Sequence, residues 1–347
     1  MKKRSYVHYL SVLKCVGMLA VVGIHVFCTP VTYWREYFSA AELWAGVFFA
    51  NVLCAWAVPV FVMVSGALFL GREVSVGKMF GKYILRLVLV LLTFGTLYAL
   101  MEIIFAERSF SVGMLAVALR NVYAGALWDH MWFVYMCIGL YVVTPPLQRL
   151  VRALDDAMLR YLLVVLFVFT CLIPQIDSMT GVTFGVYLPV RGIWLFYYLL
   201  GYVLHTGRVK IGATAGILFV LVGVIWCAIA ASIPSLWNIA DDGGIGLKHI
   251  GTSSVLAVLM ATGIFSLVRA KCTKTVDWVD TVANPLSFGV YILHAVFVNF
   301  MYKVVGFTPE RHGVWVMYAV VLAVTVCGSL TLAWLLRLIP PVRKYLL

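Results

Sequence analysis

Charged residues are scarce in this chain of 347 residues. Only 12% of them are Asp, Glu, Lys or Arg, whereas 64% are hydrophobic, and the mean hydropathy is +1.02. About a quarter of the residues of a soluble domain are charged, and a chain with this excess of apolar side chains cannot turn all of them inward in water. The shortage of charge therefore excludes a water-soluble globule and favours an integral membrane protein.

Low-complexity tracts, internal repeats and a soluble segment of any size are also missing, so we expect one membrane domain over residues 1–347. Apolar runs of about 18 to 25 residues recur along the chain, the length that crosses a hydrocarbon core of about 30 Å as a helix. The runs are continuous rather than alternating, which excludes a transmembrane β-barrel. We predict an all-α, polytopic bundle with about ten transmembrane helices, at residues 7–29, 43–70, 80–104, 131–148, 158–174, 190–206, 211–233, 250–268, 284–305 and 313–339.

Acidic residues are fewer than basic ones, with 14 Asp and Glu against 26 Lys and Arg. If both termini are cytoplasmic, 18 of the 26 basic residues fall in or beside cytoplasmic segments, seven fall in outer segments, and Lys14 lies within the first span. The positive-inside rule favours this orientation, because one helix more or fewer would invert every later loop. Since anionic lipid head groups explain most of the basic residues, the net charge of +12 does not indicate nucleic-acid binding.

Eight cysteines are present, but none has the spacing of a zinc site, so we expect neither a metal centre nor a structural disulfide. The first apolar run follows basic residues 2–4, yet it contains Lys14 and His25 and no small-residue cleavage pattern, so we interpret it as a retained helix. Two outer segments are longer than a connection between two helices requires. Residues 105–130 are expected to lie in the interface or dip into the bundle, and residues 234–249, around Asp241, form a candidate lid.

Ionisable residues within the spans mark candidate functional positions, because placing them in lipid is costly. Lys14 and His25 are eleven residues apart, which brings them within about 20° of one helix face and separates them by about 16 Å along the axis. Lys82 and Arg86, at the start of the third span, are one helical turn apart and can form an anion clamp near the cytoplasm. The alternative for this pair is that both side chains extend to lipid head groups.

A basic residue, ten intervening residues and a histidine in the first helix resemble the signature of the membrane acyltransferase type 3 family. Three further segments match that family in order: residues 61–66, residues 130–145 and residues 287–294, which read FVMVSG, HMWFVYMCIGLYVVTP and SFGVYILH. The chain departs from the family at Lys14, where arginine is usual. It also departs at Lys82 and Arg86, which are four residues apart where many members have two arginines three apart.

The resemblance implies an integral membrane O-acyltransferase that moves an acyl group, commonly acetyl from acetyl-CoA, to a hydroxyl of a cell-envelope carbohydrate. The donor would be an acyl-CoA substrate, with no permanently bound cofactor, and the acceptor an envelope glycan or a lipid-linked sugar. His25 matches the family's catalytic position. A histidine there can accept the hydroxyl proton or form an acyl-histidine, and both mechanisms stay open. Such an enzyme is expected in the inner, cytoplasmic membrane of the cell.

The other matched residues are assigned by side of the membrane. Lys14, Lys82 and Arg86 would hold the phosphates of the donor. The residues expected to support the reaction or contact the acceptor are His130, Trp132, Ser65 and His294.

Each of these residues also has a structural interpretation. Ser65 with Gly66 can permit close helix contact, and His294 can serve helix packing. His130 and Trp132 lie at the outer edge, where histidines and aromatic residues often have an interfacial role. The remaining histidines, at positions 8, 205, 249 and 312, lie near membrane edges and are expected to be structural only.

The competing function is a transporter or flippase for an anionic envelope precursor, because a helix with polar groups at two depths also suits a substrate path. Against it, the sequence has no obvious paired broken helices and no intramembrane carboxylate well placed for ion coupling. A sensor or assembly protein leaves the stripe of Lys14 and His25 unexplained. Only an acyltransferase would consume acyl-CoA.

Overall fold

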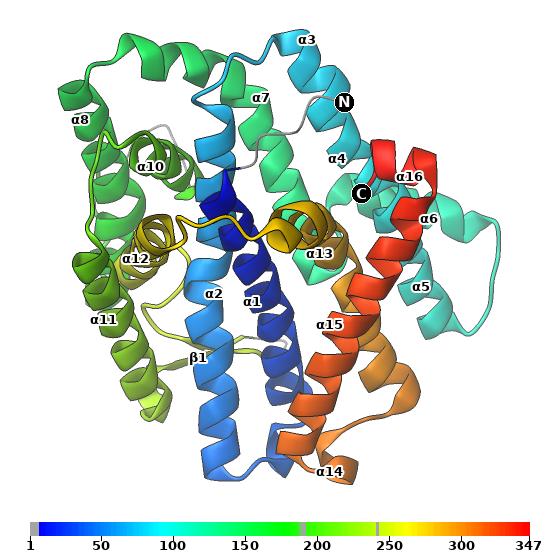
Figure 1. Ribbon diagram of the computed structural model, residues 1–347. Coiled ribbons are helices and arrows are strands. Elements are labelled where there is room, and N and C mark those ends of the chain that lie inside the picture. Colours follow the sequence, from blue (N-terminus) through cyan, green and yellow to red (C-terminus); the bar gives the residue numbers. More distant parts are fainter. Residues whose placement is uncertain (1–6, 187, 189–191, 241–242) are drawn as a thin grey trace. The chain divides into compact units, whose positions relative to one another are not determined.

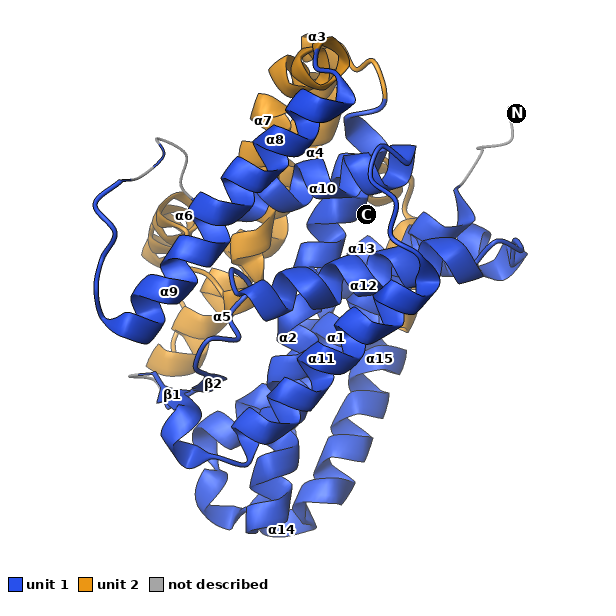
Figure 2. Cartoon of the chain, turned by 90° about the vertical axis from the view of Figure 1, so that its left-hand side faces the viewer, with its two compact units in different colours: residues 1–71, 154–329 blue, residues 72–153, 330–347 orange. Residues whose placement is uncertain are grey.

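The computed structural model describes residues 7–186, 188, 192–240 and 243–347. Residues 2–4, Arg191 (one of the seven basic residues of the predicted outer segments) and Asp241, which entered the topology prediction, lie outside the described residues, as does Asp242 of the candidate lid. The chain forms two compact units, which Figure 2 colours separately. Unit 1 comprises Met1–Gly71 and Leu154–Ser329, and unit 2 comprises Arg72–Ala153 and Leu330–Leu347. The prediction of a single domain over residues 1–347 stays a prediction.

Eight helical segments of the described chain are long and apolar enough to cross a membrane. They are His8–Tyr33, Ala40–Phe69, Val76–Glu107, Asp129–Ala153, Asp156–Thr180, Ala213–Ala231, Val279–Val305 and Val314–Leu338. Each corresponds to one of the predicted spans. The prediction of an all-α, polytopic membrane protein is confirmed.

The two other predicted spans, residues 190–206 and 250–268, fold as shorter helices. They are α10 (Trp194–Thr206, 13 residues) and α12 (Val255–Lys271, 17 residues). A helix the length of α10 is about 20 Å long, less than the hydrocarbon core of about 30 Å. Figures 1 and 2 together show α10 steeply inclined to α2. The count of ten spans and the cytoplasmic termini stay predictions.

Unit 1 is organised around two long helices, α1 and α2, which pack against each other (Figure 1). Helix α2 also packs on α10, α11 and α12, and α1 packs on α13. The elements of this unit are α1 (His8–Tyr33), η1 (Arg35–Tyr37), α2 (Ala40–Phe69), α8 (Asp156–Phe167), η5 (Val168–Leu172), α9 (Ile173–Thr180), α10, α11 (Ala213–Ala231), η6 (Pro234–Leu236), β1 (Trp237–Ile239), β2 (Ile245–Leu247), α12, η7 (Val279–Ala283), α13 (Asn284–Asn299), η8 (Phe300–Val305), α14 (Pro309–His312) and most of α15 (Val314–Leu338).

Side-chain caps define where several of these helices begin. Helix α2 starts with a capping box in which the Ser39 hydroxyl accepts from the Glu42 backbone N–H and the Glu42 carboxylate accepts from the Ser39 backbone N–H. Asp155 caps α8 and Ser254 caps α12 in the same way, each accepting a backbone N–H three residues later. These caps satisfy backbone donors that the first helical turn leaves without an intrahelical partner.

The contact between α2 and α10 requires glycine on both helices. A Cβ atom on Gly66 would collide with the carbonyl oxygen of Tyr198, and one on Gly201 would collide with the carbonyl oxygen of Met63, both well under 3.0 Å. The two backbones therefore lie against each other at this crossing, as small residues allow between membrane helices. The interpretation of Gly66 as a close-contact residue is confirmed.

The candidate lid at residues 234–249 contains a short antiparallel hairpin of β1 and β2, with Trp237 opposite Leu247. The Asn51 side chain of α2 binds this hairpin twice. Its amide nitrogen donates to the carbonyl oxygen of Ile245 at 3.2 Å, and its oxygen accepts from the backbone N–H of Leu247 at 3.0 Å. The hairpin is thus attached to α2 by a polar side chain of this spanning helix.

Unit 2 contains the third and fourth predicted spans and the outer segment 105–130. Its elements are α3 (Val76–Lys78), η2 (Met79–Ile84), α4 (Leu85–Val90), η3 (Leu91–Gly95), α5 (Thr96–Glu107), α6 (Gly113–Ala124), η4 (Asp129–Met131), α7 (Trp132–Ala153), the end of α15 and α16 (Pro340–Tyr345). Helix α6 buries Met114, Ala118 and Val122 while leaving Leu115 and Leu119 exposed. With an apolar outer face, α6 suits the interfacial position that the sequence predicts.

Candidate active site

Helix α1 carries both Lys14 and His25 without interruption. The helix runs from His8 to Tyr33, and its only proline, Pro30, lies beyond both residues. The run consists largely of apolar side chains, which favour a helix in lipid because all backbone groups are then satisfied within the segment. The predicted common face of Lys14 and His25, with about 16 Å between them along the axis, therefore rests on regular helical geometry.

His25 lies against a second histidine, His294 of α13. The two ring centroids are 5.1 Å apart, with the rings tilted by 45°. His294 is completely buried, with 0% of its surface exposed, whereas His25 is half-buried. Helices α1 and α13 thus bring together two residues that are far apart in sequence and that were predicted separately.

One backbone contact determines the tautomer of His294. Its Nδ1 lies 2.7 Å from the carbonyl oxygen of Tyr291. Because a carbonyl oxygen only accepts, Nδ1 must carry the hydrogen, and in the neutral ring Nε2 is then the acceptor nitrogen. The ring of Tyr291 packs 6.0 Å from the same imidazole. His294 is therefore a rigidly held neighbour of His25, able to take part in hydrogen bonding and proton transfer.

The opposite end of α1 carries Lys14 in a polar contact with α13. The Lys14 ammonium donates to the side-chain oxygen of Asn284 at 3.2 Å, and the Asn284 amide donates to the hydroxyl of Ser11 at 3.1 Å. Nearer the start of α1, Nδ1 of His8 lies 2.9 Å from the carboxylate of Asp280 in η7, four residues before Asn284, with both side chains at least nine-tenths buried. His8, predicted to be only an edge histidine, therefore belongs to a buried polar network.

Ser65 lies in α2, immediately before Gly66, and is half-buried. Phe61, one turn earlier, packs its ring against Gly17 of α1 and lies 6.5 Å from the ring of Tyr291. The segment 61–66 is therefore part of the packing between α1, α2, α10 and α13. A contact of the Ser65 hydroxyl with the acyl donor stays a prediction.

Lys82 and Arg86 belong to unit 2 and lie in different local structures. Lys82 is exposed in the π-helical segment η2, with its ammonium 5.5 Å from the ring centre of Tyr83. Arg86 is half-buried in α4, and its Nε donates to the carbonyl oxygen of Leu346 at 3.1 Å. Arg86 thus has a structural contact with the C-terminal segment of unit 2. An anion clamp formed by the two residues stays a prediction.

His130 and Trp132, also in unit 2, differ sharply in exposure. His130 is 4% exposed and lies 5.8 Å from the ring of Tyr98, whereas 43% of Trp132 is exposed. Tyr98 in turn stacks on Trp128 at 4.5 Å. His130 is therefore buried within unit 2 beside the ring of Tyr98, and Trp132 presents an accessible ring of the kind that stacks on sugars.

Asn284 and Asp280 are residues of this region that sequence reasoning missed. They are four residues apart, just before the proline of the ninth predicted span, and so share one helix face. His8, Ser11 and Lys14 form a matching stripe with a spacing of three. Both stripes are visible in the sequence, but nothing in it pairs segments that are about 270 residues apart.

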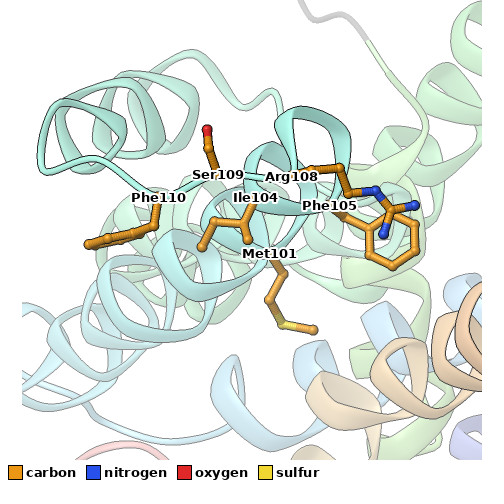
Figure 3. Close-up of a pocket in the computed structure, with 6 residues that line it drawn as sticks. All are labelled: Met101, Ile104, Phe105, Arg108, Ser109 and Phe110. Atoms are coloured by element: carbon orange, nitrogen blue, oxygen red, sulfur yellow. The ribbon is translucent and has the colours of Figure 1, made fainter.

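Unit 2 also contains an open cavity of about 560 Å³ at the end of α5, lined by Met101, Ile104, Phe105, Arg108, Ser109 and Phe110 (Figure 3). The guanidinium of Arg108 lies over the ring of Phe105, 4.5 Å from its centre. The cavity contains none of the predicted site residues. Within the described part of the chain, no group of three or more His, Cys, Asp or Glu residues is arranged to hold a metal ion.

Comparison with known proteins gives one match, which covers nearly the whole chain. A family model described as an acyltransferase domain matches residues 7–335. No curated protein and no solved structure matches the chain. The matched range includes every predicted site residue, both stripes of the polar network, seven of the eight candidate spans of the described chain and all but the last three residues of the eighth. The chain therefore belongs to the acyltransferase type 3 family and is a multi-pass membrane acyltransferase.

Proposed function

We propose that this acyltransferase moves an acetyl group from acetyl-CoA, bound at the cytoplasmic side, to a hydroxyl of a cell-envelope carbohydrate or lipid-linked sugar. The observation that carries the proposal is the contact between His25 of α1 and His294 of α13, because α1 also presents Lys14 about three turns away from His25. The extended pantetheine arm of CoA can bridge a phosphate site and a reaction centre separated in this way.

The reaction at His25 balances without any further co-reactant. The acceptor oxygen bonds to the thioester carbonyl carbon while its proton moves to the imidazole of His25. The C–S bond of the adduct then breaks, and the proton held by the imidazolium passes to the departing sulfur. The products are the acetyl ester and CoA thiol. His294, held by Tyr291, orients the His25 ring during both proton transfers. An acyl-histidine intermediate splits the same balance into two steps.

Donor binding in this proposal depends on charge at the cytoplasmic ends of the helices. Lys14 contacts the phosphates, with Lys82 and Arg86 as further candidate ligands, since ammonium and guanidinium groups form charge-assisted hydrogen bonds to phosphate oxygens. On the acceptor side we assign Trp132 as a stacking surface, His130 as its buried neighbour and Ser65 as a hydroxyl near the thioester. We assign the protein to the cytoplasmic membrane, with the predicted basic loops facing the cytoplasm in line with the positive-inside rule.

The proposal is tested by acetyl transfer with the full chain in liposomes, measuring CoA thiol release and acetyl ester together. His25→Ala should reduce turnover about 100- to 10,000-fold, the usual contribution of a positioned base, with donor affinity retained. His294→Ala should reduce turnover by a smaller factor, because the His294 side chain orients the base without accepting the proton. His312→Ala, in α14, is the matched control and should turn over at the parental rate.

Two outcomes would contradict the proposal. Near-parental turnover of His25→Ala would move the chemistry to another group, with His130 as the next candidate. No consumption of acetyl-CoA by the parent protein with any envelope saccharide would remove acetyl-CoA as the donor. A transporter or flippase would likewise leave acyl-CoA intact, so the same assay separates the two functions.

A further inference from the structure

The polar network between α1 and α13 leaves Asn284 with a defined orientation. A lysine ammonium only donates, so the Asn284 atom that faces Lys14 at 3.2 Å must be the amide oxygen. The amide nitrogen then points to the Ser11 hydroxyl, 3.1 Å away. Ser11 is 2% exposed and Asn284 is 8% exposed, so both partners are fixed by the surrounding helices.

The chemistry of this contact differs from that of the preceding turn, at Asp280. There, the carboxylate of Asp280 pairs with His8 at 2.9 Å, and its second oxygen, Oδ1, is buried with no hydrogen-bond partner among the described residues. At Lys14 the α13 residue is an amide, isosteric with aspartate but uncharged. An aspartate here would add a negative charge within hydrogen-bond distance of the ammonium. The amide holds the ammonium in place without adding that charge.

We propose that Asn284 is a positioning residue that fixes the Lys14 ammonium through a neutral oxygen and thereby sets the affinity of the protein for its anionic acyl donor. This inference rests on the proposed role of Lys14 in donor binding. The Ser11–Asn284–Lys14 chain supplies the rigidity, because each side chain is anchored by the one before it. A flexible lysine held in this way loses less conformational freedom when it binds a phosphate.

The decisive substitution is Asn284→Asp, which keeps the shape of the side chain and the oxygen that Lys14 contacts. A structural role and a donor-positioning role of Lys14 predict different effects of this substitution on the affinity for the donor. If Lys14 only joins α1 to α13, an added carboxylate strengthens that contact and leaves donor binding unchanged. If Lys14 binds the donor, the carboxylate competes with the phosphates, and the affinity for acetyl-CoA should fall roughly ten- to a hundredfold.

The experiment measures acetyl-CoA affinity and thermal unfolding of the full chain in detergent, for the parent, Asn284→Asp and Lys14→Met. Asn299→Asp is the matched control, because it makes the same change on the same helix fifteen residues later, beyond His294. It should bind the donor within about twofold of the parent. Asn284→Asp should lose affinity without a comparable loss of thermal stability.

The outcomes separate this inference from the proposed function. Parental affinity in Asn284→Asp together with weakened binding in Lys14→Met would overturn the role of Asn284 and retain that of Lys14. Parental affinity in both variants would remove Lys14 from the donor site, whatever the result at His25. Should Asn284→Asp fail to fold because the new carboxylate lies one turn from Asp280, Asn284→Ala decides the question. It should lower donor affinity severalfold, and parental affinity would overturn the proposal.

Discussion

Replacing Gly66 by alanine should destabilise unit 1 strongly, because α2 and α10 touch backbone to backbone at this position. The new Cβ atom would meet the carbonyl oxygen of Tyr198 well under 3.0 Å and the Cα atom of the same residue at 3.1 Å. A helix backbone cannot rotate away as a side chain does, so the helices have to separate. A gap of only about 0.5–1 Å forfeits roughly a quarter to a half of the dispersion energy of each contact across the interface.

The expected magnitude follows from that constraint. Overpacking of buried sites costs about 1–3 kcal/mol when side chains can adjust, and here the backbone must move, so we expect a loss of about 3 kcal/mol or more. By the scaling for domains of 150–250 residues, Tm should fall by about 6–12 °C. Thermal unfolding in detergent measures the shift, and Gly201→Ala, whose Cβ would meet the carbonyl oxygen of Met63, should behave alike.

The matched control is Gly139→Ala in α7, where a Cβ atom would meet nothing within 4 Å. Alanine is the better helix former by up to about 1 kcal/mol, so this variant should unfold at or slightly above the parental temperature. If Gly66→Ala unfolded within a degree or two of the parent while Gly139→Ala did the same, the close crossing of α2 and α10 would be refuted.

Three further outcomes are expected. Arg86→Gln should weaken acetyl-CoA binding about ten- to a hundredfold if Arg86 binds donor phosphate, whereas a loss of thermal stability with unchanged affinity would assign it to its contact with the Leu346 carbonyl. Asp280→Ala should lower stability by about 1–3 kcal/mol, because it leaves His8 buried without its acceptor; Asp280→Asn, which can still accept from Nδ1, should lose less in the same unfolding assay. A membrane-impermeant maleimide should label Cys272, in the predicted cytoplasmic loop, from the inside of sealed vesicles, and labelling only from the outside would invert the topology.

The sequence by itself determined that the chain is surrounded by lipid and that its secondary structure is helical. With so few charges, the chain has to lie in lipid, and lipid permits helices whose backbone groups are satisfied internally. Helical periodicity also placed Lys14 and His25 on one face of α1, because that face depends only on the residues between them. The small residues at positions 65–66 predicted a close helix contact, which Gly66 makes with α10.

The partners across each contact were decided only by the tertiary structure. His25 meets His294, and Lys14 meets Asn284, through helices about 270 residues apart in sequence. Sequence reasoning treated His294 as one of several candidates and passed over Asn284 altogether. In a soluble protein the apolar face of a helix shows which side is buried, but lipid tails are as apolar as a protein interior. A helix such as α2, apolar on all sides, therefore carries no mark of which neighbour it will pack against, and the packing itself selects the residues that form the site.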